Sequence, residues 1–256
     1  GQATPQTFSV IVSSCLGPFA SKEHLLDMQY GMTPRLVWHI LEKDLRAELT
    51  RRYGQEDASA IMKDAQIRFR EIVGGIEDPR QGRRYFWSLL QAGLLASIYI
   101  AARAQDPDVA PTPEECAGLF ADVCARSSAC LKIAAKLRDD FSIQGQRDIQ
   151  RSALITQMRC ADYGWRYVYT TGSDRDYMVT YRSCGILRLY HELGVPELMR
   201  AACRMPDVWA ELAGIKLERT MCLADGDPCC DFNLTLEDAP VPEKDDEGIE
   251  DAEDDK

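Results

Sequence analysis

Two short segments in the last third of the chain concentrate thiols, carboxylates and arginines. One is residues 218–232, ERTMCLADGDPCCDF, which has the pattern of a strand, a tight turn and a second strand. The other is residues 180–185, TYRSCG, where a predicted strand passes into a predicted helix. Thiols can attack electrophilic carbon and carboxylates can move protons, so the two segments indicate a site for a small molecule.

Cys184 is the best candidate for a nucleophile. It lies at the predicted start of a helix, where unpaired backbone N–H groups and the helix dipole favour a thiolate. Arg182 and Arg188 are close in sequence and would act in the same direction. The alternative is a half-buried cysteine that only fills space where the helix meets the sheet.

Arg219 lies in a predicted strand between Glu218 and Thr220. If the Arg219 side chain points inward it needs a carboxylate, from the protein or from a ligand. Alternation along a strand would place Glu218 on the opposite face from Arg219. Asp225 opens an Asp-Gly-Asp-Pro turn, whose residue types are those of an ordinary turn, and Asp231 follows two adjacent thiols.

Metal and cofactor chemistry have little support in the sequence. The chain has no C-x-x-C pair, only three histidines, and no P-loop, GxGxxG, GxSxG or HExxH motif. His191 follows Cys184 by seven residues, about 10 Å along a helix, which is too far for a dyad. We expect no metal and no cofactor, although five cysteines could in principle gather around zinc: Cys184, Cys203, Cys222, Cys229 and Cys230.

Charge and cysteine content narrow the function classes. The net charge is −11, and residues 237–256 hold eleven acids and two lysines, so the remainder is close to neutral. The acidic end predicts a disordered solubilising tail, and the absence of a basic patch argues against nucleic-acid binding. Ten cysteines among 256 residues is too few for a disulfide scaffold. With no apolar leader visible at the start, we expect a cytoplasmic protein.

Residues 85–102 form an uncharged segment of 18 residues. That length just reaches a membrane span. The segment also contains two serines, a glutamine and a glycine, so we favour a buried central helix over a membrane helix.

The chain changes pattern near residue 160. Helical periodicity predicts helices at about 34–54, 56–72, 83–104 and 112–139. The last third predicts a hairpin of strands 165–171 and 177–181, helices at 185–193 and 196–212, and strands 215–223 and 230–236. We predict one α+β domain over 1–236, with a helical part (20–160) packed on a small antiparallel sheet (161–236) that one or two helices cross.

A spaced pattern in the last third resembles a known family. It runs from Cys184 through Gly-Val-Pro-Glu-Leu at 194–198 and then through Cys203 and Asp207. It continues to Glu-Arg-Thr at 218–220, Leu-Ala-Asp-Gly-Asp at 223–227 and Cys-Asp-Phe at 230–232. Over roughly residues 158–236 it is similar to the L-2-amino-thiazoline-4-carboxylic acid hydrolase family.

The resemblance implies ring opening of a small cyclic amidine that carries a carboxylate. Such a reaction needs a nucleophile, for which we expect Cys184, and an anchor for the carboxylate, for which we expect Arg219. Asp231 or Asp225 would bind the amidinium or move protons. Three further residues are expected to bind substrate: Arg182, Glu218 and Cys230.

Two other functions remain open at this level. The ending Gly-Asp followed by Cys-Asp-Phe is also similar to vinyl-reductase-like domains, which bind small molecules without necessarily transforming them. A family member could also be recruited to specialised metabolism as a cyclase that makes or breaks a C–S or C–N bond. In each case the expected partner is a small molecule, with no nucleic acid and no membrane, and the oligomeric state is open.

Overall fold

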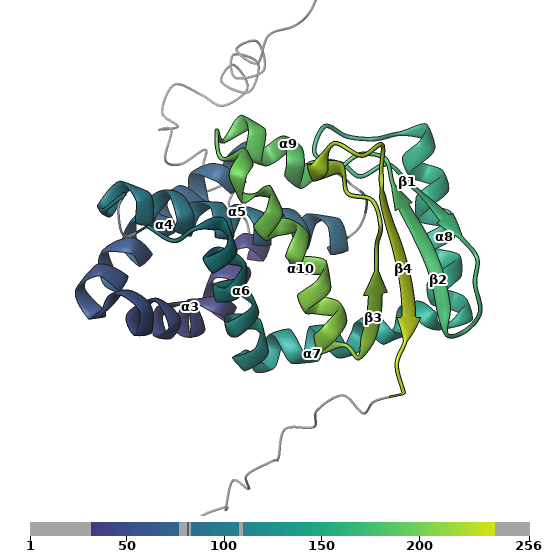
Figure 1. Cartoon of the computed structure of the whole chain (residues 1–256), viewed down its shortest axis with the longest axis horizontal. Helices are drawn as coiled ribbons and strands as arrows, with labels where there is room; N and C mark the ends of the chain where they lie inside the picture. Colours follow the sequence, from purple (N-terminus) through teal and green to yellow (C-terminus); the bar gives the residue numbers. More distant parts are fainter. Residues whose placement is uncertain (1–31, 77–80, 82, 108–109, 239–256) are drawn as a thin grey trace, which may run out of the picture.

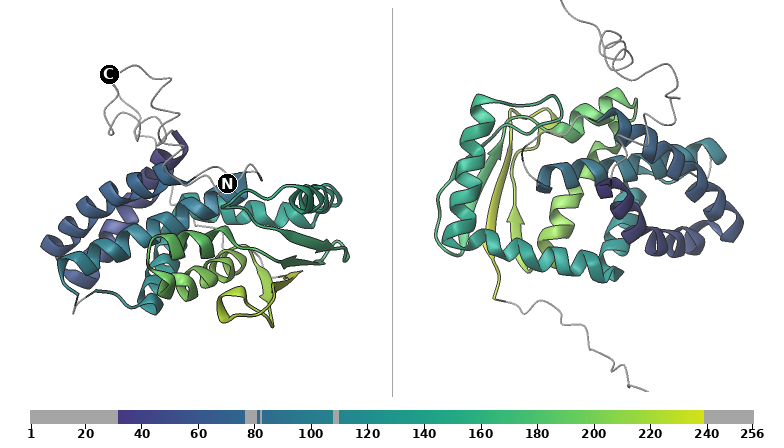
Figure 2. Two further views of the ribbon diagram at one scale, coloured as in Figure 1. Left: turned by 90° about the horizontal axis from the view of Figure 1, so that it is seen from above. Right: turned by 180° about the vertical axis from the view of Figure 1, so that it is seen from behind.

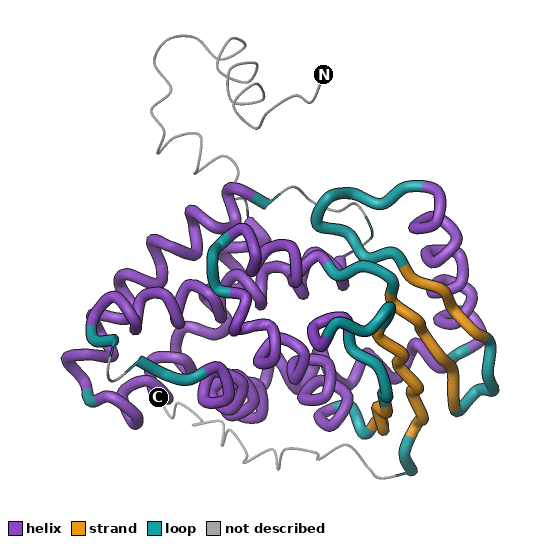
Figure 3. Tube along the Cα trace, turned by 45° about the horizontal axis from the view of Figure 1, so that its top comes forward, coloured by secondary structure: helices purple, strands orange, loops and turns teal. Residues whose placement is uncertain are grey.

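Most of the helices gather at one end of the molecule, and the strands lie at the other end with one helix beside them (Figure 3). The computed structural model describes residues 32–76, 81, 83–107 and 110–238. Its helical part consists of α3 (Met32–Tyr53), α4 (Gln55–Gly75), α5 (Arg83–Gln105), α6 (Pro113–Arg126), α7 (Ser128–Lys136), the 3-10 helix η1 (Leu137–Phe141) and α8 (Ile143–Met158). The predicted α+β class is confirmed.

The uncharged segment at 85–102 forms the core of α5, as predicted. Among the described residues one helix, Arg84–Gln105, is long and apolar enough to cross a membrane, and 78% of its apolar window is buried inside the fold. Burial of that extent is typical of a central helix. Helix α5 has α3, α4 and α6 on one side and the sheet-containing part on the other (Figure 1).

The predicted helix at 112–139 is interrupted. Thr112 forms a capping box with Glu115 at the start of α6. The helix then breaks at Ser127, whose side chain accepts a hydrogen bond from the amide of Cys130 and starts α7. A helix that the sequence patterns did not identify, α8, follows η1 and packs beside β1, where Gln157 Nε2 donates to the carbonyl of Tyr167 at 2.7 Å (Figure 2).

The sheet has four antiparallel strands in the order β1-β2-β4-β3. Their bounds are β1 (Tyr167–Thr170), β2 (Asp176–Tyr181), β3 (Ile215–Glu218) and β4 (Cys230–Leu236). The hairpin and the last strand form where the sequence predicts them. Helix α9 (Gly185–Glu192) follows β2, and η2 (Pro196–Leu198) and α10 (Met199–Leu212) then lead across to β3. Pro206 lies inside α10 without ending it.

The third strand is shorter than predicted because a carboxylate replaces its hydrogen-bonding partner. Asp231 Oδ1 accepts from the amides of Thr220 and Met221 at 2.9 and 2.6 Å, and Oδ2 accepts from the Thr220 hydroxyl at 2.6 Å. The backbone therefore leaves the ladder after Glu218 and turns through η3 (Leu223–Asp225). Gly226 closes this turn with φ of +91°, which glycine adopts without strain.

Of the predicted acidic tail, residues 237–256, only Glu237 and Asp238 belong to the described residues.

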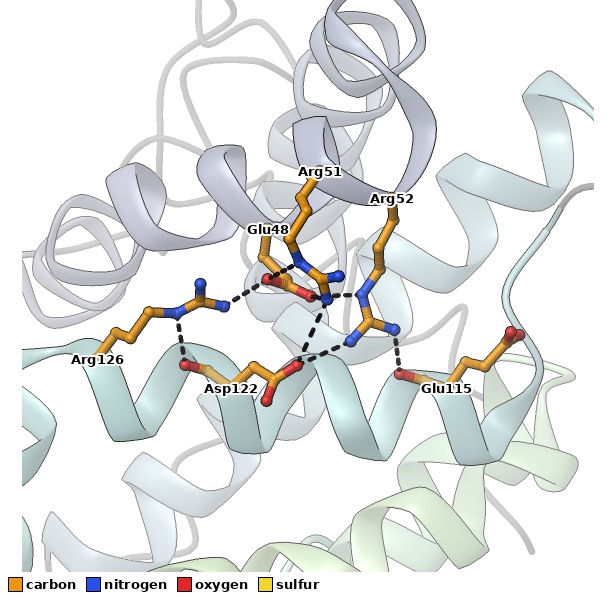
Figure 4. Close-up of polar contacts among 6 residues, drawn as sticks. All are labelled: Glu48, Arg51, Arg52, Glu115, Asp122 and Arg126. Atoms are coloured by element: carbon orange, nitrogen blue, oxygen red, sulfur yellow. Dashed lines mark hydrogen bonds and ion pairs between the residues drawn. The ribbon is translucent and has the colours of Figure 1, made fainter.

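A buried carboxylate ties α3 to α6. Glu48 is 0% exposed and accepts from Arg51 and Arg52 of its own helix and from Arg126 of α6 (Figure 4). Arg52 also bonds Asp122 at 3.1 Å. Hydrogen bonds from Arg51, Arg52 and Arg126 outweigh burial and hold the pKa of Glu48 far below its usual range.

Replacing Glu48 with glutamine should lower the free energy of unfolding by roughly 2–3 kcal/mol. Removing one partner of a buried ionic cluster leaves the others uncompensated, and partial exposure of the arginines moderates the loss. Because the folded pKa is depressed, the carboxylate's contribution is complete above the unfolded-state pKa and is lost progressively as pH falls from there through the folded pKa. Urea denaturation at pH 7 and at pH 3 should therefore show a smaller difference between the two proteins at the lower pH. Glu42→Gln, which removes an exposed pair with Arg46, is the control and should change stability by less than about 0.5 kcal/mol.

Candidate functional site

A cavity of about 650 Å³ lies against the inner face of the sheet. Alternate residues of a strand point to the same face, and the lining shows this period along both central strands. The sheet lines the cavity with Tyr177, Val179 and Tyr181 of β2 and with Cys230, Phe232 and Leu234 of β4. The site is therefore built on the predicted small sheet.

Helices α5 and α10 supply the opposite wall. Trp87 and Gln91 contribute from α5, and Met205 and Trp209 from α10. The indole N–H of Trp209 donates to Gln91 Oε1 at 3.3 Å and so joins the two helices across the cavity wall. Residues of α7 and η1 line the cavity at the end of α10 that leads to β3, among them Lys136 and Asp140.

Cys184 lines this cavity at the start of α9, as the sequence predicts. Its electrostatics differ from the expectation of a thiolate. Burial raises the pKa of Cys184, and the amides of Leu187 and Ile186 offset only part of that effect. Arg188 is held by Asp162 at 3.0 Å and Glu192 at 2.8 Å, so its charge is already neutralised. Burial therefore favours the neutral thiol of Cys184 over the thiolate.

This raised pKa predicts slow alkylation of Cys184 at neutral pH. A thiolate is the reactive form, so the rate of iodoacetamide labelling should rise with pH and reach its midpoint above that of free cysteine. Peptide mapping after timed labelling between pH 6 and 10 measures this midpoint for each cysteine. A midpoint below that of free cysteine would show a preformed thiolate instead.

Arg219 lines the same cavity as Cys184. Its Nη2 donates to Asp207 of α10 at 2.6 Å, and its guanidinium lies 5.6 Å from the centre of the Phe232 ring. Within the described part of the chain, Nε and Nη1 of Arg219 have no hydrogen-bond partner. Burial raises the pKa of Asp207 although Arg219 acts to lower it. Arg219 is thus fixed in place and keeps donors for an anionic ligand.

Three further thiols lie close to the end of the cavity that contains Cys184 and Arg219. Cys203 Sγ and Cys222 Sγ are 3.6 Å apart, and the amide of Leu223 donates to Cys230 Sγ at 3.1 Å. Burial raises the pKa of Cys230 to about 12. Across the described ranges no group of three or more His, Cys, Asp or Glu side chains has the arrangement to hold a metal ion.

Four predicted site residues lie outside the cavity lining. The Asp231 carboxylate accepts hydrogen bonds from the Thr220 hydroxyl and from the amides of Thr220 and Met221, and these bonds lower its pKa. Asp225 is exposed in the turn, and Arg182 is exposed after β2. Glu218 faces solvent, where it pairs with Lys216 at 2.7 Å. Of the seven predicted residues, the structure brings Cys184, Arg219 and Cys230 to one cavity.

Comparison with known families extends the similarity beyond the last third. Residues 87–234 match the profile of the L-2-amino-thiazoline-4-carboxylic acid hydrolase family. This chain belongs to that family. The match begins in α5, so the hydrolase family's region includes both helical walls of the cavity as well as the sheet. A search of curated proteins found no match.

The sequence alone did not identify several of the residues at this site. Asp207 belongs to the spaced pattern, but the pattern gives it no role; its hydrogen bond from Arg219 in the structure does. Trp209 and Met205 lie on the apolar face of α10, which helical periodicity could have identified as buried but not as facing a cavity. Gln91 lies in the apolar helix α5. A glutamine in such a helix is buried and needs a hydrogen-bond partner, so its position could have indicated a polar contact in the core.

Proposed function

We propose that this family member is a thiol-dependent hydrolase that opens a cyclic amidine bearing a carboxylate, of the 2-aminothiazoline-4-carboxylate type. The observation that carries the proposal is that Cys184 and Arg219, far apart in sequence, line one cavity. Arg219 would receive the substrate carboxylate through its unoccupied N–H groups, which fixes the ring beside the thiol.

The amidine itself would activate the thiol. A neutral amidine is basic enough to take the Cys184 proton, and the resulting amidinium and thiolate stabilise each other in a site where burial opposes an isolated thiolate. The sulfur then attacks the amidine carbon, the ring C–S bond breaks, and the proton ends on the departing ring sulfur. The intermediate is an isothiourea that joins Cys184 to the opened substrate.

Water completes the reaction. Its oxygen adds to the isothiourea carbon, Cys184 leaves as a thiol, and the product is an N-carbamoyl-cysteine. Substrate plus one water therefore equals product, with no oxidant or reductant. Asp231 is a positioning residue in this scheme, because it holds the backbone next to Arg219, and Asp207 orients the guanidinium.

Turnover tests this proposal. Incubation with 2-aminothiazoline-4-carboxylate should release one free thiol per ring opened, measured with a thiol-reactive dye, and the product mass should exceed the substrate mass by one water. Binding without consumption would favour the vinyl-reductase-like binding domain, a reading that the apolar lining of the cavity also suits. Formation of the ring from N-carbamoyl-cysteine, with loss of water, would favour a cyclase.

A further inference from the structure

The cavity is far longer than a single heterocycle. Cys184 lies three residues after the end of β2, where Tyr181 pairs with Cys230. The Tyr177–Leu234 pair lies four residues from that end along the same strands, and all four of these strand residues line the cavity. At about 3.3 Å per residue the lined face extends about 13 Å. A volume of about 650 Å³ falls within the range of pockets that enclose drug-sized ligands, about 300–1,000 Å³. One five-membered ring at Cys184 fills only one end.

The middle of the cavity is apolar and aromatic. Between the Arg219 end and the Lys136–Asp140 end, the lining from β2, β4 and α10 carries no formal charge, and Arg84 of α5, which also lines the cavity, is paired with Asp140. The rings of Tyr181 and Phe232 meet edge to face, 5.1 Å between centres, and form part of the floor. Such a surface gains most from an apolar or aromatic occupant.

The α5 wall adds two buried donors that have no hydrogen-bond partner among the described residues. Gln91 is 2% exposed, and its Nε2 has no hydrogen-bond partner, since its Oε1 takes the Trp209 N–H. Trp87 Nε1 on the same helix is also buried and unpaired. An unsatisfied buried donor costs about 1–3 kcal/mol. Both residues line the cavity, so a small side-chain rotation would let a ligand oxygen satisfy either donor.

We infer that the substrate is an extended amphipathic molecule: a carboxylate-bearing thiazoline or related cyclic amidine joined to an apolar, aromatic body that carries a hydrogen-bond acceptor. The head lies between Cys184 and Arg219, and the body lies along the sheet toward η1. The placement of the head rests on the proposed function; the size and polarity of the body rest on the cavity alone.

A matched series of probes tests this inference. The probes are 2-aminothiazoline-4-carboxylate, its N-(4-phenylbutyl) derivative, and the same derivative with a carbonyl in the chain. Dissociation constants are measured by calorimetry on the Cys184→Ser protein, so that turnover does not interfere. The phenylbutyl probe should bind at least about tenfold tighter than the parent, because it buries apolar surface in the cavity. Equal or weaker binding of both extended probes overturns the inference.

A cavity-filling variant locates the body. Ala210, near the end of α10, lines the cavity away from Cys184. Ala210→Phe should reduce the affinity ratio between extended and parent probes to near one, and an unchanged ratio would contradict the placement. Gln91→Leu should remove any preference for the carbonyl-bearing probe. If Ala210→Phe does not fold, the probe series on the unfilled cavity still decides the question.

The two proposals fail separately. Tight binding of the extended probes, with no ring opened in any of them by the protein with Cys184 intact, rejects the reaction and keeps the ligand class. If the parent compound is turned over but the extended probes bind no more tightly than the parent, the proposed reaction stands and the proposed ligand class is rejected.

Discussion

Replacing Cys184 with serine should reduce kcat by roughly 10³-fold or more. A serine hydroxyl is a much weaker nucleophile than a thiolate, and the described residues that line the cavity include no histidine to activate it. The fold should survive, because serine is isosteric with cysteine and is a favoured residue at a helix N-cap, the position Cys184 occupies before α9. Steady-state kinetics with the thiol-release assay measures the loss, and thermal denaturation checks folding.

Cys160→Ser is the matched control for that experiment. Cys160 is also partly buried and lies 3.7 Å from the Ser183 hydroxyl, one residue from Cys184, but it does not line the cavity. If Cys184→Ser turned over substrate at the rate of the unmodified protein, Cys184 would not be the nucleophile. Loss of folding in Cys184→Ser alone would support the space-filling role.

Replacing Arg219 with glutamine should raise KM for a carboxylate substrate by roughly 10- to 100-fold, the value of one to two charge-assisted hydrogen bonds. The same change should have little effect on the carboxamide analogue of the substrate, which has no negative charge to lose. The difference between the two substrates separates anchoring of the carboxylate from general damage to the site.

Two further variants control for the surroundings of Arg219. Arg204→Gln removes an exposed charge 4.0 Å from Asp207 without touching the cavity lining, and should leave KM unchanged. The double change Arg219→Gln with Asp207→Asn avoids leaving an unpaired carboxylate, and should show the same loss of carboxylate preference. A single variant that affects both substrates equally would show that Arg219 only supports the fold.

Local patterns predicted the elements of the last third closely. Alternation and turn residues located β4 at Cys230–Leu236, and the switch from strand to helix placed Cys184 at the start of α9. The same patterns overextended β3, because the Asp231 carboxylate captures amides that would otherwise continue the ladder. Such a contact between residues eleven positions apart is not visible in either segment alone.

The cavity could not be predicted from local sequence patterns. Gln91 and Trp209 meet across 118 positions of sequence, and Arg219 reaches Asp207 from a different element. Periodicity shows that α5 and α10 bury an apolar face, but whether that face packs solidly or borders a cavity depends on how helix and sheet fit together. For the same reason the contacts of the Asp231 carboxylate with residues 220 and 221 could not be predicted from the sequence.

A structure of the Cys184→Ala protein with 2-aminothiazoline-4-carboxylate bound tests the central claim most directly. The account predicts the ligand carboxylate on Arg219 and the amidine carbon within about 3.5 Å of where the Cys184 sulfur would lie, the distance from which attack can occur. A ligand bound elsewhere, or one held in this cavity with its amidine carbon facing away from residue 184, would contradict it.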